Sequence, residues 1–363
     1  APYVIGLARA YTAAPSRFDA VKPSEEESFL DEILWGGEHV RRMITEDGSS
    51  FGAITSGYGF WGPPELETDN LPATGDERPA SSTSGVYPGD HQAALARIAA
   101  LLREKGLQAG EWVATADRCL SYSLKMNHRG LNELSAAVDL FRATGDKKYS
   151  GLAKELFSAL AQKTDLQPSA MLVDIVQRYD AAFNEDHSSF LKGLLVPKAE
   201  ALLALADNPF GVCTFGPLEN PNFFNTPADK GGWHVGTSSY LMESANLVAL
   251  AYHYDPQPEY LEFIYDQFNW TLGMNPYDVC LMEGVGSFNL PSYHHRITFA
   301  GVARGAIPGS VVNGVTWMAV GDDRPFVDLS GQDIPAFEPN ECWLPHNTAY
   351  LNALANLMAA KAE

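Results

Sequence analysis

Apolar residues recur at spacings of three and four along most of the chain, which is the period of an amphipathic helix. In residues 25–44, for example, Phe29, Ile33 and Val40 fall near one face, after an acidic first turn that suits the positive end of a helix dipole. Alternating patterns typical of strands are nearly absent. The periodicity predicts about eleven helices, at residues 1–14, 25–44, 90–106, 109–126, 130–146, 147–162, 170–183, 188–206, 237–254, 259–273 and 346–362.

Short turns that contain Gly, Pro or Asp separate many of these helices, an arrangement typical of stacked antiparallel helix pairs. Three stretches are much longer and rich in aromatic residues, at residues 51–89, 208–236 and 275–337. Loops of that length in a compact domain usually carry function. No low-complexity linker divides the sequence, so we expect residues 1–363 to form a single domain.

The charge of the chain excludes one class of partner. The 363 residues include 45 acidic and 25 basic ones, for a formal net charge of −20. Such a surface repels phosphate backbones, so we expect no nucleic acid partner, whereas an uncharged polysaccharide is unaffected. No run of 18 apolar residues occurs, and no membrane partner is expected. The four cysteines are far apart, which argues against a zinc site and favours buried free thiols.

Two motifs stand in the last third of the chain. The stretch NWTLGMNPYDVCLMEGVGSFNLPSYHHR combines LG-x-NP, a Gly-x-Gly and an H-x-R that is formed by His294 and Arg296. The stretch FVDLSGQDIPAFEPNECWLPHNTA combines F-x-D, an aromatic residue four positions before Glu341, and Asn347 followed by a small residue. The helix FLDEILWGGEHVRRMI, the element WGPPE and the helix PGDHQAALARIAALL precede them. In order and spacing, nearly the whole chain resembles the family-nine glycoside hydrolases of the cellulase type.

The resemblance implies an all-α fold, an (α/α)6 toroid of six hairpins with its first element truncated. It also implies a glycosidase of the endo-β-1,4-glucanase type that cleaves with inversion. Glu341 would be its general acid, while His294 and Arg296 would position the sugar. An inverting glycosidase needs two carboxyl groups about 6.5–9.5 Å apart, one of which must keep its proton. Glu341 lies among Phe337, Trp343 and two prolines, an apolar setting that favours the protonated form. The alternative role for this glutamate is to stabilise the start of the following helix.

The water-activating base is not assigned within the sequence. Family members carry a D-A-G-D element whose aspartates hold the attacking water, and in the family order this element would precede Ala1. Asp90, in SGVYPGDHQ, resembles it, but its place after WGPPE matches a different family element. We therefore expect the base upstream of this chain. We also expect the chain as it stands to bind cello-oligosaccharides weakly and to hydrolyse them slowly or not at all.

Trp61, Trp233 and Trp343 lie in the long loops and are predicted to bind substrate, because sugar rings stack on aromatic faces. Burial in the core is the ordinary alternative for each. We expect no required cofactor, and whether the protein binds calcium stays an open question at this point. The resemblance implies calcium near a D-E-L turn, which here reads Asn132-Glu133-Leu134 and has lost one carboxylate. We therefore assign no metal ligand and expect Glu133 to be solvated or to cap a helix.

Some residues depart from the family pattern and leave the substrate open. Tyr293 replaces a Pro or an aliphatic residue, Trp343 replaces a small one, and eight residues separate Asp328 from Phe337. One alternative is an exo-acting β-glucosidase or glucosaminidase on the same scaffold, and another is a catalytically dead carbohydrate-binding protein. The adjacent histidines at 294 and 295 could form a metal pair, but no third ligand is near in sequence. We expect a secreted monomer that acts on a neutral polysaccharide or oligosaccharide.

Overall fold

The computed structural model describes residues 1–22, 27–52, 85–215, 236–316 and 326–361, and the regular structure within these ranges is helical. Each of the eleven predicted helices has a counterpart, with ends shifted by a few residues. In the described ranges, the extended backbone pairs only through isolated bridges. The chain divides into two compact units, whose described parts lie within residues 1–191 and 192–361. The single-domain organisation stays a prediction.

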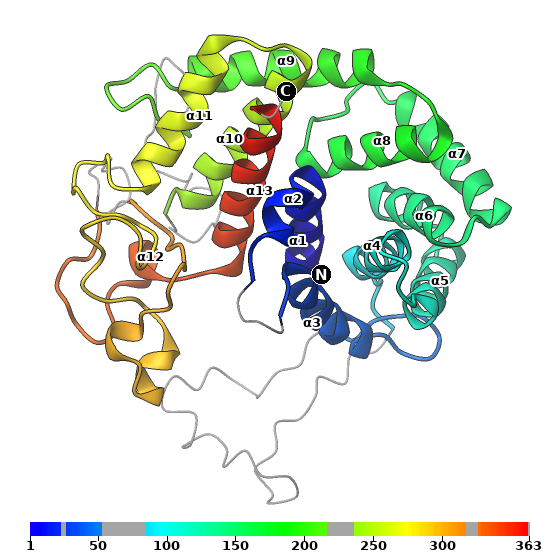
Figure 1. The fold of residues 1–363 in the computed structure, drawn as a ribbon, viewed down its shortest axis with the longest axis horizontal. Coiled ribbons are helices and arrows are strands. Elements are labelled where there is room, and N and C mark those ends of the chain that lie inside the picture. Colours follow the sequence, from blue (N-terminus) through cyan, green and yellow to red (C-terminus); the bar gives the residue numbers. More distant parts are fainter. Residues whose placement is uncertain (23–26, 53–84, 216–235, 317–325, 362–363) are drawn as a thin grey trace, which may run out of the picture. The chain divides into compact units, whose positions relative to one another are not determined.

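The first unit is built around α4 (Asp90–Glu104), which packs against α1, α3, α5 and α6. Its side chains from Gln92 to Leu102 are all buried, as expected of a helix surrounded by others. A second contact centre is α6 (Leu131–Thr144), which packs against α5, α7 and α8 (Figure 1). The remaining helices of this unit are α1 (Pro2–Ala13), α2 (Pro15–Asp19), α3 (Phe29–Arg42), α5 (Gly110–Lys125), α7 (Lys147–Ala161) and α8 (Ala170–Phe183).

Helix α1 packs against α3. The rings of Tyr11 and Phe29 stack with their centroids 6.2 Å apart, and the Tyr3 hydroxyl donates a hydrogen bond of 3.2 Å to Glu32. Helix α3 begins with a capping box, because the Ser28 hydroxyl accepts from the Asp31 N–H while the Asp31 carboxylate accepts from the Ser28 N–H. Local capping and ring packing together fix the start of the first unit.

The second unit contains most of α9 (Ser188–Ala204), which begins in the first unit. It continues with α10 (Ser238–Tyr254), which packs against both α11 (Pro258–Thr271) and α13 (Leu344–Ala360). The pairing of α10 with the C-terminal helix α13 is visible in Figure 1. Between α11 and α13 the described chain is irregular, with two short 3-10 helices (Arg296–Ala300 and Ala303–Gly305) and the single turn α12 (Phe337–Asn340). The predicted long loop at 275–337 is therefore confirmed in its described parts.

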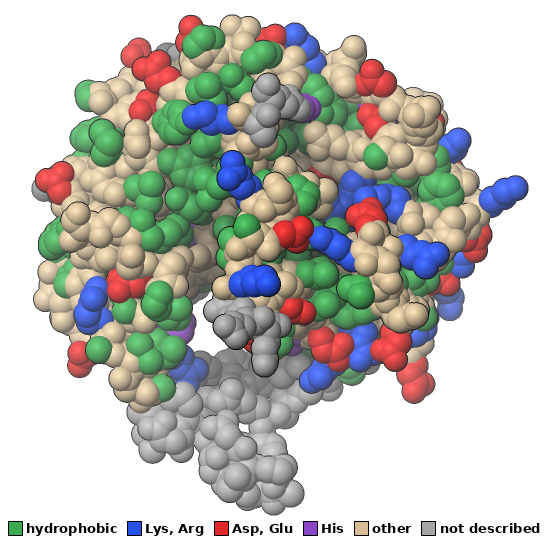
Figure 2. All heavy atoms as spheres, viewed as in Figure 1, with side chains coloured by type: hydrophobic (Ala, Val, Ile, Leu, Met, Phe, Trp, Pro, Cys, Tyr) green, Lys and Arg blue, Asp and Glu red, His purple; other side chains and the backbone are tan. Residues whose placement is uncertain are grey.

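The cysteines, the apolar character of the helices and the surface charges can be compared with the predictions. All four cysteines are free thiols, and three of them, Cys119, Cys213 and Cys280, are buried. Within the described ranges, no helix combines the length and the apolar character that crossing a membrane would require. On the face shown in Figure 2, acidic and basic side chains of the described residues are interspersed over the helices of the first unit.

A buried ion-pair network joins three helices of the first unit. Arg178 on α8 donates to Asp139 on α6 at 2.5 Å and to Asp174 at 2.8 Å, and Arg97 on α4 reaches Asp174 at 3.2 Å. The Asp139 side chain is fully buried and also accepts from Arg142 at 2.8 Å. Burial alone would raise the pKa of Asp174, but Arg178 and Arg97 hold it below its usual value. Its ionised form therefore stabilises the fold at neutral pH, and this contribution is lost as the pH falls below about 4.

Replacing Asp139 with asparagine should strongly destabilise the protein, because the guanidinium groups around it would stay buried without their shared counter-charge. Breaking a buried ion pair in this way costs about 3–5 kcal/mol. Asp117→Asn is the matched control, since it removes the charge of the partly exposed partner of Lys148, leaves an amide oxygen that can still accept from the Tyr149 hydroxyl, and should cost about 0–1 kcal/mol. Urea unfolding followed by far-UV circular dichroism measures both variants. Equal midpoints for the two would contradict a structural role for the network.

Candidate functional site

Glu341 lies on a short extended segment between two helices. The turn α12 ends at Asn340, Glu341 has φ −78° and ψ 135°, and α13 starts three residues later at Leu344. Helix α13 has no side-chain cap, and its N-cap position is Trp343. The alternative role for Glu341, stabilising the positive end of the dipole of the next helix, stays a prediction.

Two backbone neighbours hold the segment of Glu341. On one side it forms a parallel bridge with His294, and on the other Cys342 forms an antiparallel bridge with Val312. The Glu341 carbonyl accepts from the Asn313 N–H at 2.8 Å. These contacts place a segment from the first motif directly beside the glutamate of the second, although 47 positions separate His294 from Glu341.

The side chains around Glu341 line one open groove of about 430 Å³. Sequence analysis predicted four of its lining residues, which are His294, Arg296, Glu341 and Trp343. Trp343 is 49% exposed and Glu341 is partly buried, so both have a surface that a ligand in the groove could contact. The predicted substrate residues Trp61 and Trp233 lie outside the described residues. The other lining residues are His295, Cys342, Leu344 and Pro345.

Hydrogen bonds and a ring contact hold His294. Its N–H donates to the Asn340 carbonyl at 3.0 Å, and its Nδ1 lies 2.6 Å from the Pro335 carbonyl. A carbonyl oxygen only accepts, so Nδ1 carries a proton in this arrangement. The ring also meets Phe337 edge to face, with centroids 6.0 Å apart. The imidazole therefore has a fixed orientation at the groove wall.

Its neighbour His295 also lines the groove, a position that sequence analysis did not predict. Burial lowers the pKa of His295, although the nearby Glu341 carboxylate opposes that change. Its Nδ1 accepts a hydrogen bond of 3.1 Å from the Ile297 N–H, which starts the 3-10 helix that begins at Arg296. Within the described residues, no cluster of three or more His, Cys, Asp or Glu side chains could hold a metal ion. Both histidines line the groove.

Tyr293, one of the departures from the family pattern, points away from solvent and is fully buried. Its hydroxyl bonds to the carboxylate of Glu283, which also accepts from Arg304 at 3.3 Å. The Arg304 carbonyl in turn accepts from the Tyr293 N–H at 2.8 Å. This residue is absent from the groove lining, and it acts as an anchor behind the loop that carries His294.

Two further motif residues organise loops around the groove. The carboxylate of Asp328 accepts from the N–H groups of Ser330 at 2.9 Å and Ala336 at 2.7 Å. Burial would raise the pKa of Asp328, but these hydrogen bonds outweigh it and keep the pKa low. The Asn347 side chain donates to the Gly309 carbonyl at 2.7 Å and accepts from the Val311 N–H at 3.1 Å. Both side chains therefore form hydrogen bonds with backbone groups of the loops.

Asn313 supports the segment of Glu341 from the other side, and sequence analysis missed it. Its side-chain amide donates to the Phe337 carbonyl at 2.8 Å, and its amide oxygen lies 2.6 Å from Nε2 of His346. The opposite nitrogen of that ring bonds to the Ser239 hydroxyl on α10. Burial lowers the pKa of His346 to about 4, so the ring is neutral near pH 7. A buried chain of hydrogen bonds thus connects α10 and α13 with the Glu341 segment.

The turn at Asn132-Glu133-Leu134 has a structural role in the first unit. Glu133 is buried, and its carboxylate accepts from the Tyr87 hydroxyl at 2.7 Å, from the Gln92 amide at 2.6 Å and from the Gly130 N–H at 2.7 Å. The last bond caps α6. Of the two roles expected for Glu133, helix capping is confirmed and the solvated one is wrong.

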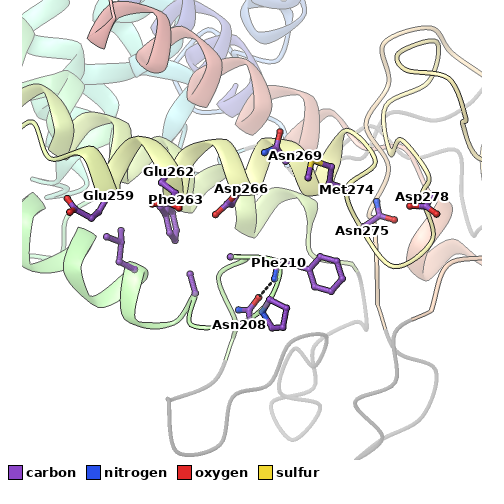
Figure 3. A pocket seen from close by; sticks show the side chains of 14 residues that line it. Asn208, Phe210, Glu259, Glu262, Phe263, Asp266, Asn269, Met274, Asn275 and Asp278 are labelled. Carbon is purple, nitrogen blue, oxygen red and sulfur yellow. Dashed lines mark hydrogen bonds between the residues drawn. The ribbon is translucent and has the colours of Figure 1, made fainter.

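A larger groove of about 830 Å³ lies elsewhere in the second unit, between α11 and the loop at residues 208–211 (Figure 3). Glu259, Glu262 and Asp266 fall on one face of α11, and Figure 3 shows Asp266 pointing toward the loop that carries Phe210. Burial, followed by the negative charge of Glu262, raises the pKa of Asp266. Among the described residues that line this groove, there is no Lys, Arg or His to orient a ligand. We therefore place the candidate site at Glu341.

The LG-x-NP element borders this larger groove through Asn275. Its buried side chain donates to the carbonyls of Trp270 at 2.9 Å and Val279 at 2.8 Å, and so closes the turn after α11. The first part of the first motif is therefore structural, while its last part, the H-x-R, reaches the candidate site.

The chain belongs to glycosyl hydrolase family 9, whose family model matches residues 3–354. A search of curated proteins finds no match to the sequence. Among solved structures, the chain is similar to a metagenome-derived glycoside hydrolase family 9 endoglucanase, with a TM-score of 0.71, 20% identity, and coverage of 98% of this chain and 67% of that one. It is also similar to the GH9 protein of Bacteroides ovatus (TM-score 0.72, 19% identity, coverage 99% and 69%).

An endoglucanase from the termite Nasutitermes takasagoensis gives a TM-score of 0.69 at 17% identity, with coverage of 99% of this chain and 84% of that one. At such identities the likeness shows the fold. The prediction of an (α/α)6 fold is thereby confirmed. The family assignment makes the chain a glycosidase, and the roles of individual residues rest on the geometry of the groove.

The buried His346 should make the protein less stable in mild acid. Its folded pKa of about 4 lies below an unfolded value near 6.5, so the unfolded state binds more protons between these values and stability falls as the pH drops through that window. The contribution lost is about 3 kcal/mol. Urea unfolding at a series of pH values should show a smaller loss for His346→Gln than for the wild type between pH 6.5 and 4. An unchanged slope in the variant would contradict a neutral buried ring.

Proposed function

We propose that the chain hydrolyses β-1,4-linked glucan with inversion, and that Glu341 gives a proton to the leaving oxygen. The observation that carries this proposal is the groove in which a partly buried carboxyl lies between a fixed His294 and a half-exposed Trp343. Family 9 membership and likeness to proteins named as endoglucanases support the substrate class. The described part of the groove lining carries no cluster of positive charge, which suits a neutral ligand.

Each side chain has a chemical task in this proposal. Glu341 protonates the glycosidic oxygen, which makes the departing sugar a neutral alcohol. His294 and Arg296 hold sugar hydroxyls and so keep the scissile bond within reach of the acid. Trp343 offers a flat apolar face to a sugar ring. The second carboxylate, which activates water, has no assigned residue in the chain, and Asp328 is a poor candidate because two backbone N–H groups occupy its oxygens.

In a parent enzyme that also contains the water-activating base, replacing Glu341 with glutamine should lower kcat on cellotetraose by about 10²–10⁴-fold, because an amide cannot donate the proton that the leaving oxygen needs. Affinity and unfolding midpoint should stay close to those of the wild type. Glu262→Gln, in the larger acidic groove, is the matched control and should keep full activity. Product formation followed by NMR measures the rates. Loss of activity in the control with none in Glu341→Gln would move the site to the α11 groove.

Trp343→Ala should weaken the binding of cellotetraose roughly ten-fold, since burying an exposed aromatic face against a sugar contributes about 1–2 kcal/mol. The control is Trp35→Ala, which removes a tryptophan that is 76% exposed on α3, outside the groove. Calorimetry should show wild-type affinity for this control. The affinity of the wild type should also be the same in low and high salt, because the ligand is neutral. Equal losses in both variants would contradict a role for the groove.

A further inference from the structure

Asn340, the residue before Glu341, is fully buried, and every polar group of its side chain is used. Its amide nitrogen donates to the carbonyls of Ser292 at 3.0 Å and Asp328 at 2.8 Å. Its amide oxygen accepts from the Asp328 N–H at 3.2 Å. One carboxamide thus ties together two segments that lie 48 and 12 positions away along the chain.

These two segments are the ones that hold His294. Ser292 stands two residues before His294. The hydrogen bond from Asn340 to the Ser292 carbonyl therefore holds the backbone that leads to His294. Asp328 closes a loop by accepting from the Ala336 N–H, and this loop carries Pro335, whose carbonyl holds the His294 ring at 2.6 Å. The main chain of Asn340 adds the third contact, because its carbonyl accepts from the His294 N–H at 3.0 Å.

We propose that Asn340 is a positioning residue, which sets the place and the ring orientation of His294 relative to Glu341. Only asparagine satisfies this environment. An aspartate would set a carboxylate against two carbonyl oxygens, and an alanine would leave three backbone groups without partners in a buried position. A glutamine side chain is one methylene longer than that of asparagine, and this fully buried position has no room for the extra group. The inference rests on the proposed function, since it assigns His294 a task at the sugar.

A double-mutant cycle on the affinity for cellotetraose tests the coupling. His294→Ala should weaken binding about ten-fold, the order expected for one lost hydrogen bond. Asn340→Asp and Asn340→Ala should weaken it to a similar extent. In either Asn340 background, adding His294→Ala should cause almost no further loss, because the imidazole is already out of place. A purely structural role would make the losses multiply.

The matched control is Asn275→Ala, which removes another buried carboxamide that donates to two backbone carbonyls in the same unit. Combined with His294→Ala, this control should give multiplicative losses. A second readout, the 15N chemical shifts of the His294 ring, reports which nitrogen carries the proton. In the wild type the neutral ring should be protonated at Nδ1 alone, and the Asn340 variants should show a mixture of the two neutral forms, while Asn275→Ala keeps the wild-type signals.

The outcomes separate the inference from the proposed function. Non-multiplicative losses together with a changed ring signal support it. Multiplicative losses in a wild type that does bind, or a wild-type ring signal in both Asn340 variants, overturn the positioning role alone. Failure of the wild type to bind cellotetraose would overturn the proposed function and this inference with it.

Discussion

The backbone polar groups of the irregular segment around Glu341 must find hydrogen-bond partners, and this requirement shapes the candidate site. A helix satisfies its N–H and C=O groups by internal hydrogen bonds, but an extended segment packed among helices must find hydrogen-bond partners in other segments. Glu341 and Cys342 find their partners in His294 on one side and in Val312 and Asn313 on the other. The same bonds that satisfy the backbone therefore bring the two motifs to one groove.

Amide side chains complete this arrangement where strand pairing ends, and those of Asn340 and Asn313 are buried. Asn340, Asn313 and Asn347 each bond to backbone groups of neighbouring segments. Close approach also requires glycine at one position, since a Cβ on Gly314, at φ +88°, would lie 2.4 Å from the Ser238 hydroxyl. The result is a rigid wall made from loops, which is what a site that must orient a sugar needs.

The charge near Glu341 depends on two histidines, His295 and His346, and on Arg296, which is permanently charged. Burial lowers the pKa of both His295 and His346, so neither adds a positive charge beside Glu341 near neutral pH. Among the described lining residues, Arg296 carries a permanent positive charge. Arg296 can thus supply a charged donor for a sugar hydroxyl, while burial disfavours a positive charge on His295 and His346.

The helices could be predicted from the sequence because each has a local cause, an apolar period of 3.6. The caps that set their exact starts, such as Ser28 and Asp146, were not predicted. The groove residues His294 and Glu341 could be named because they stand in spaced motifs. Asn340 and Asn313 could not, because their bonds join segments far apart in the chain and no local pattern marks a buried amide. The place of Tyr293 was also beyond prediction, since its burial depends on Glu283 and Arg304.

The central claim is that Glu341 acts on a sugar held in the groove with His294 and Trp343. A crystal structure of the Glu341→Gln variant with a bound cello-oligosaccharide tests it most directly. The account predicts a sugar ring over Trp343 and a glycosidic oxygen within about 2.6–3.2 Å of the side-chain amide at position 341. A sugar chain bound instead along α11, beside Asp266 and Phe210, would contradict it.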